Sequence, residues 1–239
     1  MAKTAIQLVN DVAGNLRRKG PTGVTAYTTL TQDFDAVFLT SMVNLAKREV
    51  ESRWKWDCLR STVTFDTVAA TRTYDTSVLA TVSSDPVVTT NRSYLLYDRW
   101  QRPMFWDVTS GHEGRIVVRP RDDVEHIAAS VPTQQIAIPG MVAVYQTGAG
   151  LTVNFGYLPS GIRSYRFQAI IPQADFSVTT TEILVPHEPV VLLATAMCME
   201  ERGEEFGGSP ERWHDKYDEC LGSIIGPQVN AEDMVMRRV

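Results

Sequence analysis

Apolar residues recur at helical spacing at both ends of the chain. In the first segment these residues are Ile6, Val9, Val12, Ala13 and Leu16. Thr4 and Gln7 have the spacing of a capping box, so the pattern predicts a helix from Thr4 to about Lys19. Gly20-Pro21 is expected to end it, because proline cannot continue the hydrogen-bond ladder.

A longer amphipathic helix is expected after a threonine-rich loop. Thr31 is the predicted capping residue, and Asp33 and Asp35 in the first turn favour the positive end of the helix dipole. The apolar stripe of this helix consists of Phe34, Phe38, Met42, Leu45 and Ala46, and continues toward Trp54.

The helical period ends at Ser61. Short β-branched or aromatic runs, separated by turn residues, predict about nine strands. They lie at 62–65, 94–97, 104–108, 116–118, 135–138, 141–145, 151–155, 165–171 and 182–185. With no helix expected between them, the strands should pair antiparallel as a β-sandwich or small barrel.

Helical spacing returns after Pro186. The apolar face of the third helix comprises Val190, Val191, Ala194, Met197 and Cys198, and Gly207-Gly208 should end it. Ser209-Pro210 is a strong start signal for a fourth helix, with the stripe Trp213, Tyr217, Cys220, Leu221 and Ile224. Gly226-Pro227 is expected to end this helix, which leaves Gln228 to Val239 as a tail that orders only on binding.

These elements predict an α+β fold. Residues 1–60 and 186–226 should form one discontinuous helical bundle, because each pair of amphipathic helices lacks a local partner. Residues 61–185 should form an inserted β domain, and residues 227–239 a C-terminal docking tail.

Composition and charge narrow the possible functions. A chain of 239 residues with 44% hydrophobic and 21% charged residues is expected to fold. Its net charge of -5, with both signs interleaved, argues against neutralising nucleic-acid phosphates. Three cysteines without metal-site or disulfide spacing suggest reduced thiols, and the absence of a signal peptide or ~20-residue apolar span suggests synthesis in a cytoplasm without a membrane partner.

No pattern of catalytic or metal-binding residues is visible in the sequence. His112, His126, His187 and His214 are scattered over different predicted elements. His214 precedes Cys220 by six residues, a spacing that places the two on different faces of a helix. We therefore predict a protein that is not an enzyme, with no metal and no cofactor.

Two groups of aromatic residues leave alternatives open. Tyr94, Tyr97, Trp100, Phe105 and Trp106 suit either a β core or a platform that stacks sugars. In the second case the protein would be a carbohydrate- or receptor-binding β module on a helical stalk. Trp54 and Trp56 either anchor the junction between domains or close the bundle core.

The run Asn44-x-Ala46-x-x-Glu49, followed by Trp54-x-Trp56-x-x-Leu59, resembles the N-terminal signature of phage head-to-tail adaptor proteins of the tail tubular protein A, or gatekeeper, type. The opening helix with Leu8-Val9-Asn10-Asp11 and the proline-led helix after Val185-Pro186-His187 are similar to that family's plan.

The resemblance implies a structural virion protein of the neck or tail, made in the host cytoplasm. It implies a homo-oligomeric ring, typically of twelve copies, between the portal protein and the next tail or nozzle protein, with DNA passing through the lumen without specific binding. For such a ring, the C-terminal tail suits docking on the portal. Its docking residues would be Met234, Val235, Met236, Arg237, Arg238 and Val239.

Overall fold

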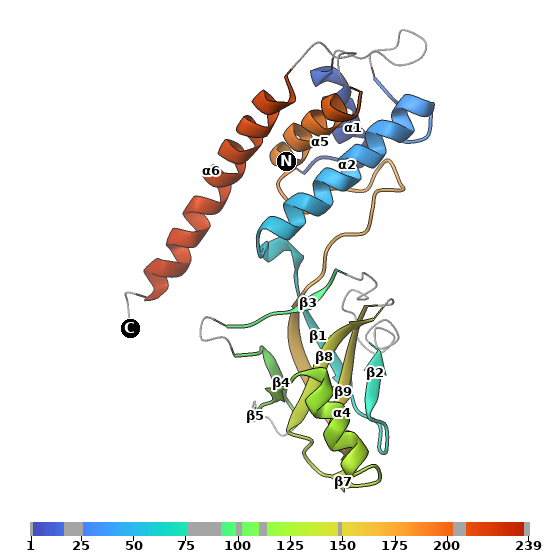
Figure 1. Ribbon diagram of the computed structural model, residues 1–239, viewed down its shortest axis with the longest axis vertical. Helices are drawn as coiled ribbons and strands as arrows, with labels where there is room; N and C mark the ends of the chain where they lie inside the picture. Colours follow the sequence, from blue (N-terminus) through green and yellow to red (C-terminus); the bar gives the residue numbers. More distant parts are fainter. Residues whose placement is uncertain are drawn as a thin grey trace. The chain divides into compact units, whose positions relative to one another are not determined.

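The computed structural model describes residues 2–16, 26–75, 92–98, 102–109, 114–147, 150–202 and 209–236. Contacts within the chain divide it into two units (Figure 1). The helical unit consists of Met1–Cys58 and Gln173–Val239, and the β unit of Leu59–Pro172. The fold is mixed α/β, with five α-helices and several sheets in the described part of the chain, and none of these sheets closes into a barrel.

Four helices make up the helical unit: α1 (Ala5–Asn15), α2 (Phe34–Arg53), α5 (His187–Arg202) and α6 (Pro210–Met236). Helix α5 packs against the other three, so the C-terminal helices complete the core that the N-terminal helices begin. Buried aliphatic residues of α1, α2 and α5, among them Leu8, Leu39 and Val190, fill this core.

Helix α1 begins as the sequence predicts and ends earlier. The backbone N–H of Thr4 donates to the Gln7 side chain (2.9 Å), as expected of a capping box. The helix ends at Asn15 instead of near Lys19, and Gly20-Pro21, the expected stop, lies outside the described residues.

Helix α2 corrects two predictions. Asp33, not Thr31, is its capping residue, because the Asp33 carboxylate accepts the N–H of Ala36 at 2.7 Å. The buried face is also different from the predicted stripe. It comprises Ala36, Leu39, Val43, Ala46, Lys47, Val50 and Glu51, whereas Phe34 and Leu45 are exposed.

Helix α6 begins at Pro210, which confirms the Ser209-Pro210 start signal. The predicted stop at Gly226-Pro227 is wrong, because the helix continues through Pro227 to Met236. Proline removes the hydrogen bond from its own nitrogen, but it does not prevent later residues from forming theirs. The segment predicted as a detached tail is therefore helical as far as Met236, and Arg237, Arg238 and Val239 lie outside the described residues.

Two main sheets form the β unit. One contains β1 (Arg60–Asp66), β11 (Ser164–Ile170), β4 (Phe105–Asp107) and β5 (Gly114–Arg115) in that order, with β3 (Tyr94–Leu95) also pairing with β11. The other has the order β2 (Thr73–Asp75), β9 (Gly150–Phe155), β8 (Met141–Thr147), β6 (Val117–Val118). A two-stranded sheet joins β7 (Gln135–Ile136) to β10 (Leu158–Pro159).

The expectation of purely antiparallel pairing without helices is wrong. Strands β6 and β8 run parallel, as do β7 and β10. A helix that was not predicted, α4 (Arg121–Ser130), lies between β6 and β8 in the chain and packs on β8 and β9. This is the crossover connection that a parallel pair requires, so the missed helix and the missed parallel pairing have one cause.

One hydrophobic cluster unites the two main sheets. Phe65, Phe105 and Phe167 enter it from the first sheet, and Tyr74 and Phe155 from the second. The rings of Phe105 and Phe167 stack with centroids 5.5 Å apart, and Phe65 contacts both sheets. None of the helices in the described ranges is long and apolar enough to cross a membrane.

The cluster predicts a large effect for one aromatic truncation. Phe65→Ala should destabilise the β unit by about 3–5 kcal/mol, because it removes a ring that touches both sheets and leaves a cavity. Hydrogen exchange of the β1 and β11 amides, measured by mass spectrometry on the full chain, tests this. Val68→Ala is the control: this side chain is exposed, so its loss should change protection by less than about 0.5 kcal/mol.

Candidate interaction surfaces

Residues 173–185, called the strap here, lie on the helical unit in an extended path. The strand predicted at Glu182–Val185 is not formed: Glu182 makes only an isolated bridge with Thr4. Backbone hydrogen bonds join the strap to the chain just before and within α1, from Ala5 N–H to Thr181 O (2.8 Å) and from Ile183 N–H to Lys3 O (3.0 Å). The strap therefore joins the helices, and not the β core.

A buried lysine fixes the start of the strap. Lys47 on α2 is fully buried, and its ammonium donates to the carbonyl oxygens of Gln173 (2.6 Å) and Ala174 (3.0 Å). Glu51, one turn later and also buried, lies 3.5 Å from this ammonium and accepts the backbone N–H of Gln173 at 3.1 Å. These contacts offset the cost of removing both charges from water.

Two asparagines hold backbone segments in the same manner. The Asn44 amide donates to Phe176 O (3.4 Å) and accepts from Phe176 N–H (2.8 Å). The Asn10 amide makes the equivalent pair with Tyr27, at 3.0 and 2.6 Å. Each asparagine side chain thus satisfies both backbone groups of one residue. Asn44, the first residue of the Asn44-x-Ala46-x-x-Glu49 run, therefore has a structural role.

The two tryptophans at the end of α2 differ in burial. Trp56 is 2% exposed, and its Nε1 donates to Val50 O at 2.8 Å. Trp54 follows the last residue of α2 and is only half-buried. Trp56 therefore packs in the protein core, whereas Trp54 keeps surface available.

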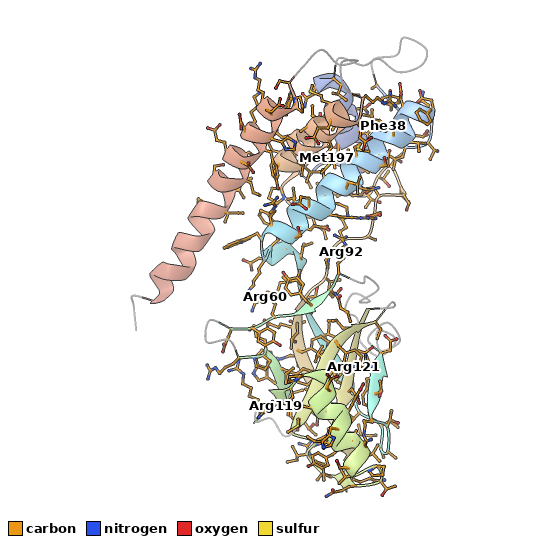
Figure 2. The ribbon with its side chains drawn as sticks, viewed as in Figure 1. Phe38, Arg60, Arg92, Arg119, Arg121 and Met197 are labelled. Carbon is orange, nitrogen blue, oxygen red and sulfur yellow. The ribbon has the colours of Figure 1, made fainter. Side chains whose placement is uncertain are left out.

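Helix α2 carries a second, largely exposed apolar face, on which Arg202 of α5 lies over the two phenylalanine rings. We call it the outer stripe and define it as the apolar residues Phe34, Val37, Phe38 and Leu45 together with Ser41 between them. Phe34 is 79% exposed, Val37 49% and Leu45 45%. Phe38, which is labelled on α2 in Figure 2, is half-buried. The Arg202 guanidinium lies 4.1 Å from the centroid of the Phe38 ring and 5.7 Å from that of Phe34. The spacing i, i+3, i+4, i+7, i+11 makes this one continuous stripe along the helix.

The sequence pattern that led to the wrong face of α2 is itself the signal for the outer stripe. Apolar residues lie on both sides of this helix, and single-chain burial accounts for only one of them. Contiguous exposed apolar patches on soluble proteins mark contact surfaces.

The aromatic platform considered for sugar binding is divided by the sheet. Phe105 points into the core, whereas Trp106, the next residue on β4, lies under the Arg166 guanidinium at 5.4 Å. Tyr94 and Tyr97 are exposed, and Trp100 lies outside the described residues. Phe105 is therefore not part of such a surface, whereas Tyr94 and Trp106 lie opposite Ile170 and Arg166, which share one face of β11.

Arginines of the β unit bind acceptors within the protein. Arg163 pairs with the buried Asp107 (2.6 Å), while Arg102 and Arg115 both reach Asp98 (3.1 and 2.9 Å). Burial alone would raise the pKa of Asp107, but hydrogen bonds from Thr109 and Arg163 outweigh it and hold the pKa below its usual range. Burial raises the pKa of the nearby Tyr165 hydroxyl.

The residue types that carry chemistry are dispersed. His214 contacts Glu200 at 2.8 Å, His126 is exposed on α4, His187 opens α5, and His112 lies outside the described residues. Burial raises the pKa of the Cys220 thiol, which makes it less nucleophilic. No group of three or more His, Cys, Asp or Glu side chains that could hold a metal ion occurs in the described ranges.

A shallow pocket of about 500 Å³ lies between α1 and α5. Asn10, Asn15 and Glu188 are among its lining residues, and Lys3 and Asp11 form an ion pair across 2.6 Å at its edge. Asn10 already binds Tyr27, and Asn15 donates to Thr195 at 3.2 Å. Lys3, Asn10, Asp11 and Asn15 of this pocket are thus occupied by contacts within the protein.

The buried lysine gives a test of the strap. Lys47→Met should destabilise the helical unit by about 3–5 kcal/mol, because it leaves Glu51 buried without its cation. Adding Glu51→Gln should recover part of this loss in urea unfolding, so the two effects should not add. The matched control is the neighbouring Arg48→Met. It removes a half-exposed pair with Asp175 and should cost less than about 1 kcal/mol.

The Asp107–Arg163 pair predicts a pH-dependent contribution to stability. Because the folded-state pKa of Asp107 lies below the ordinary 3.8, the ionised carboxylate stabilises the fold above that value and the contribution is lost as pH falls through the folded pKa. Asp107→Asn should therefore destabilise the protein by roughly 2 kcal/mol at pH 7. The gap to wild type should narrow in thermal unfolding below about pH 4. An equal gap at pH 7 and pH 3 would contradict this assignment.

No protein-family model matches the chain, and no curated protein matches it. The function must therefore be argued from the surfaces of the molecule itself.

Proposed function

We propose that this protein is a structural subunit of a ring that joins the portal vertex of a phage head to its tail. The observation that carries the proposal is the outer stripe, since a long helix with one buried and one largely exposed apolar face suits contact with another protein. The resemblance of the Asn44 to Leu59 region to head-to-tail adaptors supports the same assignment.

The helices and sheets suit the architecture that this role requires. We propose that the four helices of the helical unit act as a bundle and that the two main sheets act as an inserted sandwich around the shared cluster. A closed ring repeats one heterologous interface, so each copy must offer two different complementary surfaces. Bundle and β unit together provide enough surface for both.

Charge is consistent with DNA that passes without being gripped. Outside residues 59–172 the chain has 19 acidic and 13 basic residues. Within that range it has ten arginines, no lysine and nine acidic residues, and arginines such as Arg163 and Arg115 bind protein acceptors. A mildly acidic lumen repels phosphates and lets the polyanion slide.

The C-terminal residues Met234 to Val239 are the proposed portal contact. Helix α6 places the beginning of this segment at the end of a 27-residue helix, and Arg237 and Arg238 add positive charge after it. The next tail or nozzle protein would bind the opposite side of the ring.

Mixing the purified protein with the portal protein of the same virus tests the proposal. Negative-stain images and mass measurements should show rings of the protein, about twelve copies each, stacked on portals. A variant lacking only residues 237–239 should still form rings and bind portals more weakly. A wild-type protein that stays monomeric and unbound with portal at micromolar concentrations would refute the adaptor role.

A further inference from the structure

We propose that the outer stripe of α2 receives the C-terminal end of α6 from a second copy of this chain. The arm is defined as residues 227–236 of α6, and the contact would be the heterologous interface of the ring. This inference rests on the proposed function, because it names the partner surface that a repeated subunit needs.

Helix lengths show that the arm extends past its own bundle. Helix α5 has 16 residues and α6 has 27, and the pair of His214 with Glu200 sets their alignment near the C-terminal end of α5. At 1.5 Å per residue, Pro227 lies about 20 Å and Met236 about 33 Å along α6 from His214. Helix α5 begins 13 residues before Glu200. Helix α6 therefore passes the N-terminal end of α5 near Pro227.

The arm cannot cover the stripe of its own chain. The stripe begins beside the C-terminal end of α5, where Asp35 pairs with Arg202 at 2.9 Å and Arg202 covers Phe38. Measured from the C-terminal end of α5, the stripe extends along α2 for about 16 Å. The arm begins about 20 Å from the same end, and α6 runs in the same direction as α2. A continuous helix does not turn back, so any arm on the stripe comes from another copy.

The arm and the stripe match in length. The arm is about 15 Å long and the stripe about 16 Å. The sequence of the arm includes Val229, Met234, Val235 and Met236 together with Glu232 and Asp233, and the stripe offers two exposed aliphatic side chains and two aromatic rings. Helix-on-helix packing over a length of this order is a common mode of recognition.

The contact is head-to-tail, as a ring requires. Each copy would give one arm and receive one, so the same interface repeats until the rotation closes. The contact uses residues 227–236, so in this arrangement Met234, Val235 and Met236 of the proposed portal segment belong to the ring interface, and the residues from Arg237 onward contact the portal.

A complementation experiment tests the inference. One variant, Val37→Glu with Leu45→Glu, keeps the arm and disrupts the stripe at exposed positions; the other ends at Pro227 and keeps only the stripe. Each alone should lose at least tenfold in self-association, measured by analytical ultracentrifugation and by ring formation on portals. Mixed together, they should form a 1:1 pair that goes no further, because each supplies the surface that the other lacks.

Ile162→Glu, at a 75% exposed aliphatic residue of the β unit, is the control and should assemble as wild type does. If either altered protein forms rings as wild type does, or if the mixture gives no pair while wild type forms rings, the inference is wrong and the adaptor role stands. If both altered proteins form rings but no longer bind portals, the stripe and arm are portal contacts and the inference is again wrong. If wild type forms neither rings nor portal complexes, both proposals fail.

Discussion

The helical unit depends on a buried charge. The chain leaves this unit after Cys58 and returns at Gln173, and the returning strap has no sheet to hold it. Lys47 replaces the missing sheet by donating to two strap carbonyls, with Glu51 balancing its charge. A buried ammonium without partners would strongly destabilise the folded state. Most positions of the strap are therefore excluded, because they would leave Lys47 without its carbonyl acceptors. The electrostatic requirement fixes where the strap enters, and the backbone pair of Asn44 with Phe176 then fixes its direction.

The parts of the fold that local chemistry controls could be predicted from the sequence. The capping box at Thr4, the Ser209-Pro210 start and the β-branched and aromatic runs of β8 and β9 each act within a few residues, and each is present. Helix α4 was missed although Asp122 and Asp123 in its first turn and the buried Val124 and Ala128 are ordinary helix signals. Its ten residues lie within a run of strands, so the prediction of a continuous β region outweighed these local helix signals.

The long-range polar contacts could not be predicted in this way. Lys47 and Gln173 are 126 residues apart, and Asn44 and Phe176 are 132 apart. On a helical wheel Lys47 belongs to a polar face, and only the returning strap turns that position into a buried one. The outer stripe was misassigned for a related reason, because α2 has apolar residues on two faces and periodicity alone does not say which face the chain covers.

The end of α6 connects folding to assembly. A helical segment without tertiary contacts is marginal in water, and a proline at its base removes one of its few hydrogen bonds. The turns after Pro227 extend beyond the length of α5, the helix on which α6 packs. The outer stripe differs from the arm in that its helix packs within the chain while several of its apolar side chains remain exposed to water. In the proposed ring, contact between these two surfaces of neighbouring copies would stabilise both, so that the helical arm would be a product of ring closure and complete rings would be favoured over free subunits.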